Sequence, residues 1–155
     1  MYLIDREGIQ KIIPHRQPML LIDGLMECDT SRYTGSCGLT VGENYNVALE
    51  KDSSLPAFAL IEVMAQAAAA IIYYSILGNN LQPPDKGLLL SVRNFKYMRK
   101  ASVPKGTFLI AHATVEYSDD KYKQVSAYVT MNNEIISEAR LSLFAPLPTT
   151  LKENS

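Results

Sequence analysis

One acidic residue, Glu62, lies in an otherwise apolar stretch of the chain. Residues 57–77 read AFALIEVMAQAAAAIIYYSIL, and Glu62 and Gln66 are the polar side chains near its start. A carboxylate among apolar side chains is costly unless it is paired or performs chemistry. Burial would raise its pKa and favour the proton-donating form that a general acid needs. Glu62 is therefore a candidate catalytic residue; the alternative is a carboxylate that merely pairs with a nearby basic or hydroxyl group.

The chain contains only two histidines, His15 and His112. A neutral imidazole suits proton transfer near neutral pH, so both are considered as the base that would accompany Glu62. His112 lies in the strand-like run 109–113, and we expect it to be an ordinary strand residue. The sequence shows no glycine-rich phosphate loop, no Cys/His metal cluster and no Gly-x-Ser-x-Gly nucleophile motif. We therefore expect neither a metal nor a cofactor.

A group of basic side chains precedes the turn at residues 104–106. Its members are Arg93, Lys96, Arg99 and Lys100. Their charge would attract an acidic partner protein. The alternative is a solvated, charged edge that discourages strand-to-strand aggregation. The sequence favours neither reading.

The elements before the apolar stretch are short. The pattern predicts a helix over residues 5–13, capped by Asp5 and stopped by Pro14. Strands are expected at residues 18–23 and 34–41, followed by a long polar loop over residues 42–55.

The apolar stretch itself predicts a long helix. It begins at Ser53 or Ser54, with Pro56 in its first turn, and ends near Leu77. Only strand-like segments follow, at residues 87–95, 107–118, 122–131 and 134–144, with a tight hairpin at Asn132–Asn133. Because the helix is apolar nearly all round, it needs apolar surface on every side. The pattern predicts an α+β fold in which one curled antiparallel sheet wraps around the helix and a partner subunit covers what remains.

Length and composition set the class of protein. The 155 residues suit one domain, expected over residues 1–145 with a C-terminal tail at 146–155. A formal net charge of -1 gives no electrostatic reason to expect nucleic-acid binding. Glu62 and Gln66 argue against a membrane span through residues 57–77. Cys28 and Cys37 lack metal-ligand spacing, and the N-terminus carries charges where an export signal needs an apolar run, so we expect a cytoplasmic protein.

Three segments resemble the bacterial 3-hydroxyacyl-[acyl-carrier-protein] dehydratases, in the same order along the chain. Residues 12–23 (IIPHRQPMLLID) are similar to the family's Leu-Pro-His-Arg-x-Pro-Phe-Leu-Leu-Val-Asp opening. Residues 55–66 (LPAFALIEVMAQ) are similar to its Met-Pro-Gly-x-x-x-x-Glu-x-Met-Ala-Gln helix start. Residues 95–106 (FKYMRKASVPKG) look like its basic strand and Val-Pro-Gly turn. The resemblance covers roughly residues 12–144 and implies the hotdog fold.

The chain departs from the family at one catalytic position. The family carries a Gly-His-Phe-Pro motif, with its histidine fourteen residues before the acidic residue. Here that position is Ala48, and residues 42–55 contain no histidine. Ala57 also replaces the glycine after the helix proline. This variation resembles a divergent branch of predicted dehydratases found in aryl polyene-type lipid gene clusters.

The resemblance implies roles for the candidate residues. Glu62 corresponds to the family's catalytic acid, whereas His15 corresponds to a histidine described as structural, a role that we favour over that of a substitute base. Pro56, Ala57, Phe58 and Gln66 would surround the thioester, whose oxygen is held by backbone N–H groups at the helix start. For Gln66 we favour packing and hydrogen bonding at the subunit interface over contact with substrate. The four basic residues would contact an acyl carrier protein.

The residues leave several functions open. The first is a hydro-lyase acting alone with Glu62 and an unusual second group, His15 or a water. The second is a half-site subunit, in which Glu62 completes a site whose histidine comes from a paralogue across a heterodimer. A non-catalytic acyl-thioester scaffold and a hotdog acyl-CoA thioesterase are further alternatives. Acyl chain length, carrier protein versus coenzyme A, and homodimer versus heterodimer are also left open.

Overall fold

Six strands and two helices make up the fold of the computed structural model, which describes residues 1–16, 19–42, 54–84 and 87–146. The elements in chain order are α1 (Arg6–Ile12), β1 (Gly24–Asp29), β2 (Thr34–Thr40), α2 (Ala59–Gly78), β3 (Leu88–Tyr97), β4 (Phe108–Ser118), β5 (Tyr122–Met131) and β6 (Glu134–Phe144). All six strands form one antiparallel sheet in the order β1-β2-β4-β5-β6-β3.

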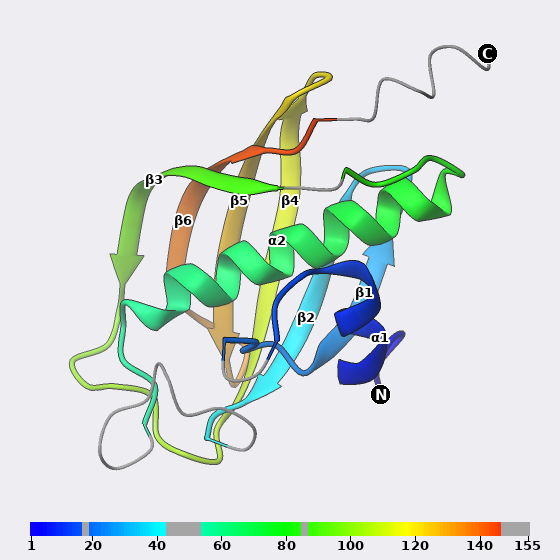
Figure 1. Ribbon diagram of the computed structural model, residues 1–155. Coiled ribbons are helices and arrows are strands. Elements are labelled where there is room, and N and C mark those ends of the chain that lie inside the picture. The colour runs from blue at the N-terminus through cyan, green and yellow to red at the C-terminus, as the bar shows by residue number, and fades with distance from the viewer. Residues whose placement is uncertain (17–18, 43–53, 85–86, 147–155) are drawn as a thin grey trace.

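Helix α2 lies along the concave face of the curled sheet (Figure 1). It touches every strand, and thirteen of its residues are buried. The helix is long and apolar enough to cross a membrane by length and composition, but its burial is that of a core helix in a globular fold. The core is formed between α2 and the inner side chains of the sheet, including Leu39, Leu109, Val129 and Leu141. The predicted hotdog architecture is confirmed.

The second half of the sheet follows the predicted boundaries closely. Strands β5 and β6 occupy the predicted residues, joined by Asn132 and Asn133 with φ of 53° and 66°. Asparagine tolerates this left-handed conformation, which two-residue hairpins require. The Asp5 cap is also confirmed, because its carboxylate accepts a hydrogen bond from Gly8 N at 3.0 Å.

Three expectations about element boundaries were wrong. The described part of residues 18–23 is extended but belongs to no strand, since side chains rather than a neighbouring strand bind most of its backbone. Strand β1 was missed because its sequence, GLMECD, lacks apolar alternation. Helix α2 starts at Ala59 rather than before Pro56, because Leu55 is held extended by two hydrogen bonds to Val103. Most of the loop expected over residues 42–55 and of the tail expected over residues 146–155 lies outside the described residues, namely residues 43–53 and 147–155.

Candidate functional site

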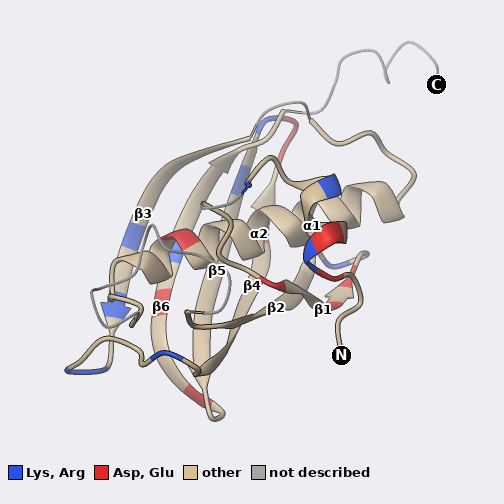
Figure 2. Ribbon diagram, turned by 60° about the horizontal axis from the view of Figure 1, so that its bottom comes forward, with Lys and Arg blue, Asp and Glu red and all other residues tan. Residues whose placement is uncertain are grey.

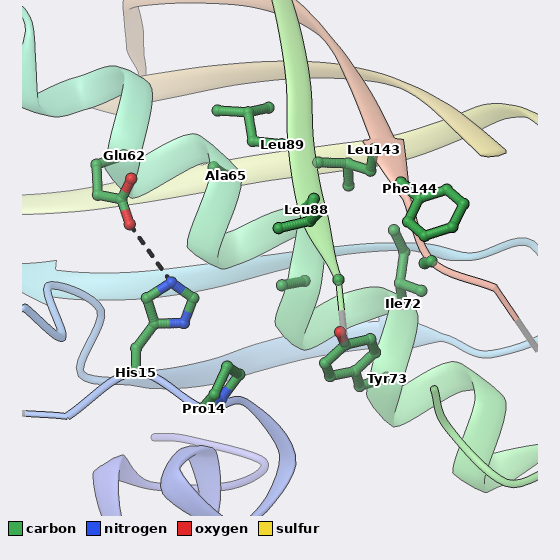
Figure 3. Close-up of a pocket in the computed structure, with 13 residues that line it drawn as sticks. Pro14, His15, Glu62, Ala65, Ile72, Tyr73, Leu88, Leu89, Leu143 and Phe144 are labelled. Atoms are coloured by element: carbon green, nitrogen blue, oxygen red, sulfur yellow. Dashed lines mark ion pairs between the residues drawn. The ribbon is translucent and has the colours of Figure 1, made fainter. Parts of the chain in front are cut away.

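Glu62 and His15 face each other at the edge of a cavity (Figure 3). Glu62 lies in the first turn of α2, and His15 lies on the segment that follows α1. The distance from His15 Nε2 to Glu62 Oε1 is 3.5 Å, and the two side chains are 29% and 40% exposed. The fold therefore brings together the acid and one of the two histidines of the chain.

Gln66 fixes the Glu62 carboxylate from one turn further along α2. Its amide nitrogen donates to Glu62 Oε1 at 2.9 Å and to the carbonyl of Met19 at 2.8 Å. Its amide oxygen accepts from the backbone N–H of Leu21 at 2.8 Å. Gln66 is fully buried, so these hydrogen bonds form in a medium of low polarity. Leaving one of their donors or acceptors unpaired there would be costly. The Gln66 side chain therefore links Glu62 to residues 19–21 by hydrogen bonds.

Arg6 of α1 holds the opposite side of the same extended segment. Its guanidinium donates to the carbonyls of Leu20 at 2.7 Å and Ile22 at 3.1 Å, and pairs with Asp23 at 2.9 Å. Alternate backbone groups of residues 19–22 are therefore bound by Gln66 on one side and by Arg6 on the other. This double attachment replaces the pairing that a neighbouring strand would give.

The charge state of Glu62 differs from the prediction made for a buried acid. Burial acts to raise the pKa of Glu62, but hydrogen bonds from His15 and Gln66, together with the charge of His15, hold the pKa below its ordinary value. The expectation that Glu62 is proton-donating was therefore wrong for this chain by itself. The physical reason is that two donors converge on the carboxylate and favour its ionised form.

The two ring nitrogens of His15 have different surroundings: Nε2 faces Glu62, and Nδ1 is buried. Nδ1 also has no hydrogen-bond partner among the described residues. A neutral ring with its proton on Nδ1 would leave a buried donor unpaired, whereas a proton on Nε2 points at Glu62. Nε2 is thus the nitrogen that faces the carboxylate, as expected of a residue that positions Glu62.

The cavity beside this pair is mostly apolar. Its volume is about 110 Å³, and one side is formed by α2 residues that share a face: Glu62, Ala65, Ala69, Ile72 and Tyr73. The other side comes from the start of β3 and the end of β6, through Gly87, Leu88, Leu89, Leu143, Phe144 and Ala145, with Pro14 beside His15. An apolar slot that ends at a fixed carboxylate suits a ligand with an apolar chain and a polar reacting end.

The other predicted binding residues do not line this cavity. Pro56 and Ala57 form the turn that leads into α2, accepting hydrogen bonds from Ala59 N and Leu60 N. Phe58 is 67% exposed on the outside of the same turn. Gln66 forms its hydrogen bonds within this chain, and its expected place at a subunit interface stays a prediction.

The four basic residues gather on and just after β3, as Figure 2 shows in blue. Arg93, Lys96 and Lys100 are exposed, whereas Arg99 is half-buried and its Nε has no partner among the described residues. Lys96 pairs with Glu138 of β6 at 3.5 Å. Arg93 lies directly opposite Arg140 in the β3–β6 register, which puts two like charges side by side.

His112 lies on β4 away from the cavity. Its ring stacks on Tyr128 of β5 with centroids 4.4 Å apart and an interplanar angle of 9°. Burial lowers the pKa of His112, partly opposed by the charge of Glu27. These contacts agree with the expectation of an ordinary strand residue.

Sequence reasoning did not single out the far wall of the cavity. This wall includes Tyr73, Gly87 and Leu88. In the sequence, Tyr73 looks like one more core position of the apolar helix, and Gly87 and Leu88 look like the start of a strand. The spacing from Glu62 through Ala65, Ala69 and Ile72 to Tyr73 marks one helical face and was the available signal.

Comparison with known proteins identifies the family. The model of the ApeP-like family, described as ApeP dehydratase, matches residues 7–153. The chain belongs to the ApeP-like dehydratase family. Among its curated relatives is the 3-hydroxyacyl-[acyl-carrier-protein] dehydratase FabZ of Rickettsia bellii, 30% identical over 141 residues, which covers 90% of this chain and 94% of the relative. FabZ of Rickettsia felis is 29% identical over 142 residues, with the same coverage.

The solved structures agree with this assignment at the level of the fold. The dehydratase heterocomplex ApeI:P from Xenorhabdus doucetiae contains a chain with a TM-score of 0.80 and 21% identity, covering 99% of this chain and 97% of that one. A thioesterase candidate from Shewanella oneidensis reaches a TM-score of 0.62 at 8% identity, covering 91% of this chain and 93% of that one. Several functions thus share this fold, and the dehydratase family is the one that the sequence joins.

Proposed function

We propose that the chain supplies the acidic half of a hydro-lyase site that removes water from 3-hydroxyacyl groups carried on an acyl carrier protein, with a histidine-bearing paralogue as its partner. The observation that supports this most is the Glu62 carboxylate, fixed by Gln66 at the end of an apolar cavity. Family membership supports the reaction class, and the FabZ relatives support the substrate class.

The reaction divides naturally between two side chains. A base takes a proton from C2 while the C3 hydroxyl leaves with a proton from an acid, so the products are the 2-enoyl thioester and water. Glu62 is the acid in this scheme, and the base is a histidine that the partner contributes. His15 is a poor candidate for that base, because its Nε2 lies against Glu62 and its Nδ1 is buried, so neither nitrogen is placed to take the C2 proton.

The charge state of Glu62 also favours a partner. In this chain the pKa of Glu62 is held low and its side chain is 40% exposed. A subunit that covers the cavity would remove the carboxylate from water, and desolvation raises the pKa of an acid. Assembly would thereby convert Glu62 from a resting carboxylate into a proton donor.

The open edge of the sheet offers a place for the partner. Strand β3 pairs only with β6 among the described residues, so its other edge has unpaired backbone groups. Leu88, Leu89 and Leu90 on this strand are 58%, 40% and 51% exposed. Natural proteins rarely leave such an apolar edge uncovered. Leu88 and Leu89 also line the cavity, so a subunit paired along β3 would close the site.

The basic residues support an acidic carrier protein as the donor of substrate. Arg93 faces Arg140 across strands β3 and β6, an arrangement that is unfavourable until an anion lies between or above the two charges. Lys100 continues the positive surface beyond β3. The proposed complex is a cytoplasmic assembly in which residues 1–145 form one domain.

The deciding experiment measures water loss from a 3-hydroxyacyl carrier protein by mass spectrometry. The chain alone should give no product, the pair with the paralogue should give the 2-enoyl thioester, and Glu62→Gln in the pair should abolish it. His112→Gln serves as the matched control and should leave turnover unchanged.

Other outcomes would contradict the half-site. Turnover by the chain alone, lost in Glu62→Gln, would establish an independent enzyme. Full turnover by the pair that contains Glu62→Gln would make this chain a scaffold. Release of free carrier thiol without dehydration would identify a thioesterase.

A further inference from the structure

The cavity has a polar group at each end. Glu62 and Tyr73 both line it and lie eleven residues apart on α2, which is about 16 Å along a helix at about 1.5 Å per residue. Between them the helix contributes Ala65, Ala69 and Ile72, two of which have no side chain beyond Cβ. Ala65 and Ala69 thus line the cavity with small side chains between the carboxylate and the phenol, and Figure 3 shows Glu62 and Tyr73 at different positions along α2.

The Tyr73 hydroxyl has no hydrogen-bond partner among the described residues. The side chain is only 7% exposed, and burial raises the pKa of Tyr73, which keeps the hydroxyl protonated as a donor. The hydroxyl oxygen is not among the buried polar atoms that lack a partner, so water in the cavity can reach it. Ile72, Leu88, Leu143 and Phe144 line the cavity around it with apolar atoms. The hydroxyl is thus an isolated polar group at the far end of an apolar slot.

Gly87 provides the space that the hydroxyl occupies. A Cβ atom built at Gly87 would overlap the Tyr73 hydroxyl oxygen, and the next nearest atom is Tyr73 Cζ at 3.6 Å. Gly87 also lines the cavity at the start of β3. Any larger residue at this position would force the phenol to move, so the glycine and the tyrosine form one unit.

We propose that Tyr73, seated against Gly87, is a specificity-determining residue that binds a hydrogen-bond-accepting oxygen at the distal end of the acyl chain. The inference rests on the proposed function, because it assumes that an acyl chain fills this cavity. A plain alkyl chain would expel the water that reaches the hydroxyl and leave the donor unpaired. A chain that ends in a hydroxyl, ether or carbonyl oxygen would pair with it.

The test measures, by calorimetry, the binding of acyl-pantetheine thioesters to the full chain in complex with its histidine-bearing paralogue. The probes form a series of increasing chain length, each prepared as a plain alkyl chain and as its ω-hydroxy counterpart. At the length that reaches Tyr73, the ω-hydroxy probe should bind on the order of tenfold more tightly than its alkyl partner. Shorter pairs should show no difference, because their ends lie short of the phenol.

Two variants and one control assign the preference to the phenol. Tyr73→Phe should remove the preference, and Gly87→Ala should weaken it by displacing the hydroxyl. Tyr74→Phe is the matched control: Tyr74 is the neighbouring half-buried tyrosine, it does not line the cavity, and its variant should behave as the parent chain. Thermal unfolding of each variant verifies that the fold is retained.

The outcomes separate this inference from the function on which it rests. Equal binding of both members of every pair, or a preference that survives in Tyr73→Phe, overturns the role of Tyr73 and leaves acyl binding intact. If no probe binds at any length, acyl binding in this cavity is wrong, and the inference falls with it.

Discussion

Two donors converge on one carboxylate at the centre of the site. Glu62 Oε1 receives Gln66 Nε2 at 2.9 Å and lies 3.5 Å from His15 Nε2. Each donor favours the ionised acid, whereas burial opposes it. The pKa of Glu62 therefore reflects opposing effects. Removing one of the two donors should shift this pKa in a direction that can be stated in advance.

His15→Ala should raise the pKa of Glu62. The substitution removes a hydrogen bond and a nearby charge, while the burial that raises the pKa remains. Titration of the Glu62 carboxyl carbon by NMR measures the change. His112→Ala should leave the Glu62 titration where it is, because that ring stacks on Tyr128 and does not line the cavity. An unchanged Glu62 in the His15 variant would contradict the assigned contact.

The same balance predicts how stability depends on pH. A carboxyl whose pKa is lowered by folding stabilises the folded state above its unfolded-state pKa, and this contribution is lost as the pH falls through the folded-state pKa. The stability difference between the parent chain and Glu62→Gln should therefore be constant near neutral pH and shrink in acid. Chemical denaturation at a series of pH values measures it. A difference that grows towards low pH would reverse the sign assigned here.

At the scale of elements, α1 and α2 position the carboxylate through the segment between α1 and β1. Arg6 and Gln66 bind alternate backbone groups of residues 19–22 from opposite sides. Asp23 extends the attachment to the sheet, because it accepts the N–H of Thr40 at 2.7 Å. The carboxylate is thus linked through this segment to α1 and to strand β2.

Arg6→Ala should destabilise the fold by about 3 kcal/mol, because it removes the ion pair with Asp23 and the donor to two backbone carbonyls in a partly buried setting. Urea unfolding measures the loss. Arg32→Ala is the matched control, since Arg32 is 81% exposed and contacts Asp29 at 3.9 Å. That variant should cost less than about 1 kcal/mol. Equal losses in the two variants would remove the special role given to Arg6.

The sequence was informative where local physics decides the structure. Asn132 and Asn133 predict the hairpin because their backbone conformation is a property of the residues themselves. Glu62 was found because a charge in an apolar helix is visible without a structure. The attachment by Arg6 could not be predicted, since its guanidinium reaches carbonyls fourteen and sixteen residues away. The unpaired hydroxyl of Tyr73 likewise depends on where Gly87 comes to lie.

At the scale of the whole molecule, the two ends of the sheet differ. The outer edge of β1 is covered in part by the N-terminal residues, which exchange hydrogen bonds between Leu3, Ile4 and Leu25. The outer edge of β3 has no such cover among the described residues. Assembly should therefore proceed through β3.

Leu90→Lys should weaken assembly without unfolding the chain. Leu90 is 51% exposed in the isolated subunit, so a charge there costs little until a partner covers it. Sedimentation of the chain with its paralogue, or alone, measures the shift towards monomer. Leu81→Lys is the control, because Leu81 is also exposed, at 39%, but follows the end of α2. Assembly that survives Leu90→Lys unchanged would exclude this edge as the interface.

The bare apolar edge has a consequence for how the cell must supply this subunit. A copy that is synthesised without its partner presents three leucines and a row of unpaired backbone groups to any passing strand. In the proposed heterodimer, copies without a partner should therefore aggregate or be degraded, and the soluble amount should follow the scarcer of the two subunits. If the pair forms as proposed, the exposed edge of β3 makes balanced synthesis of the two subunits important, whatever the chemistry at Glu62.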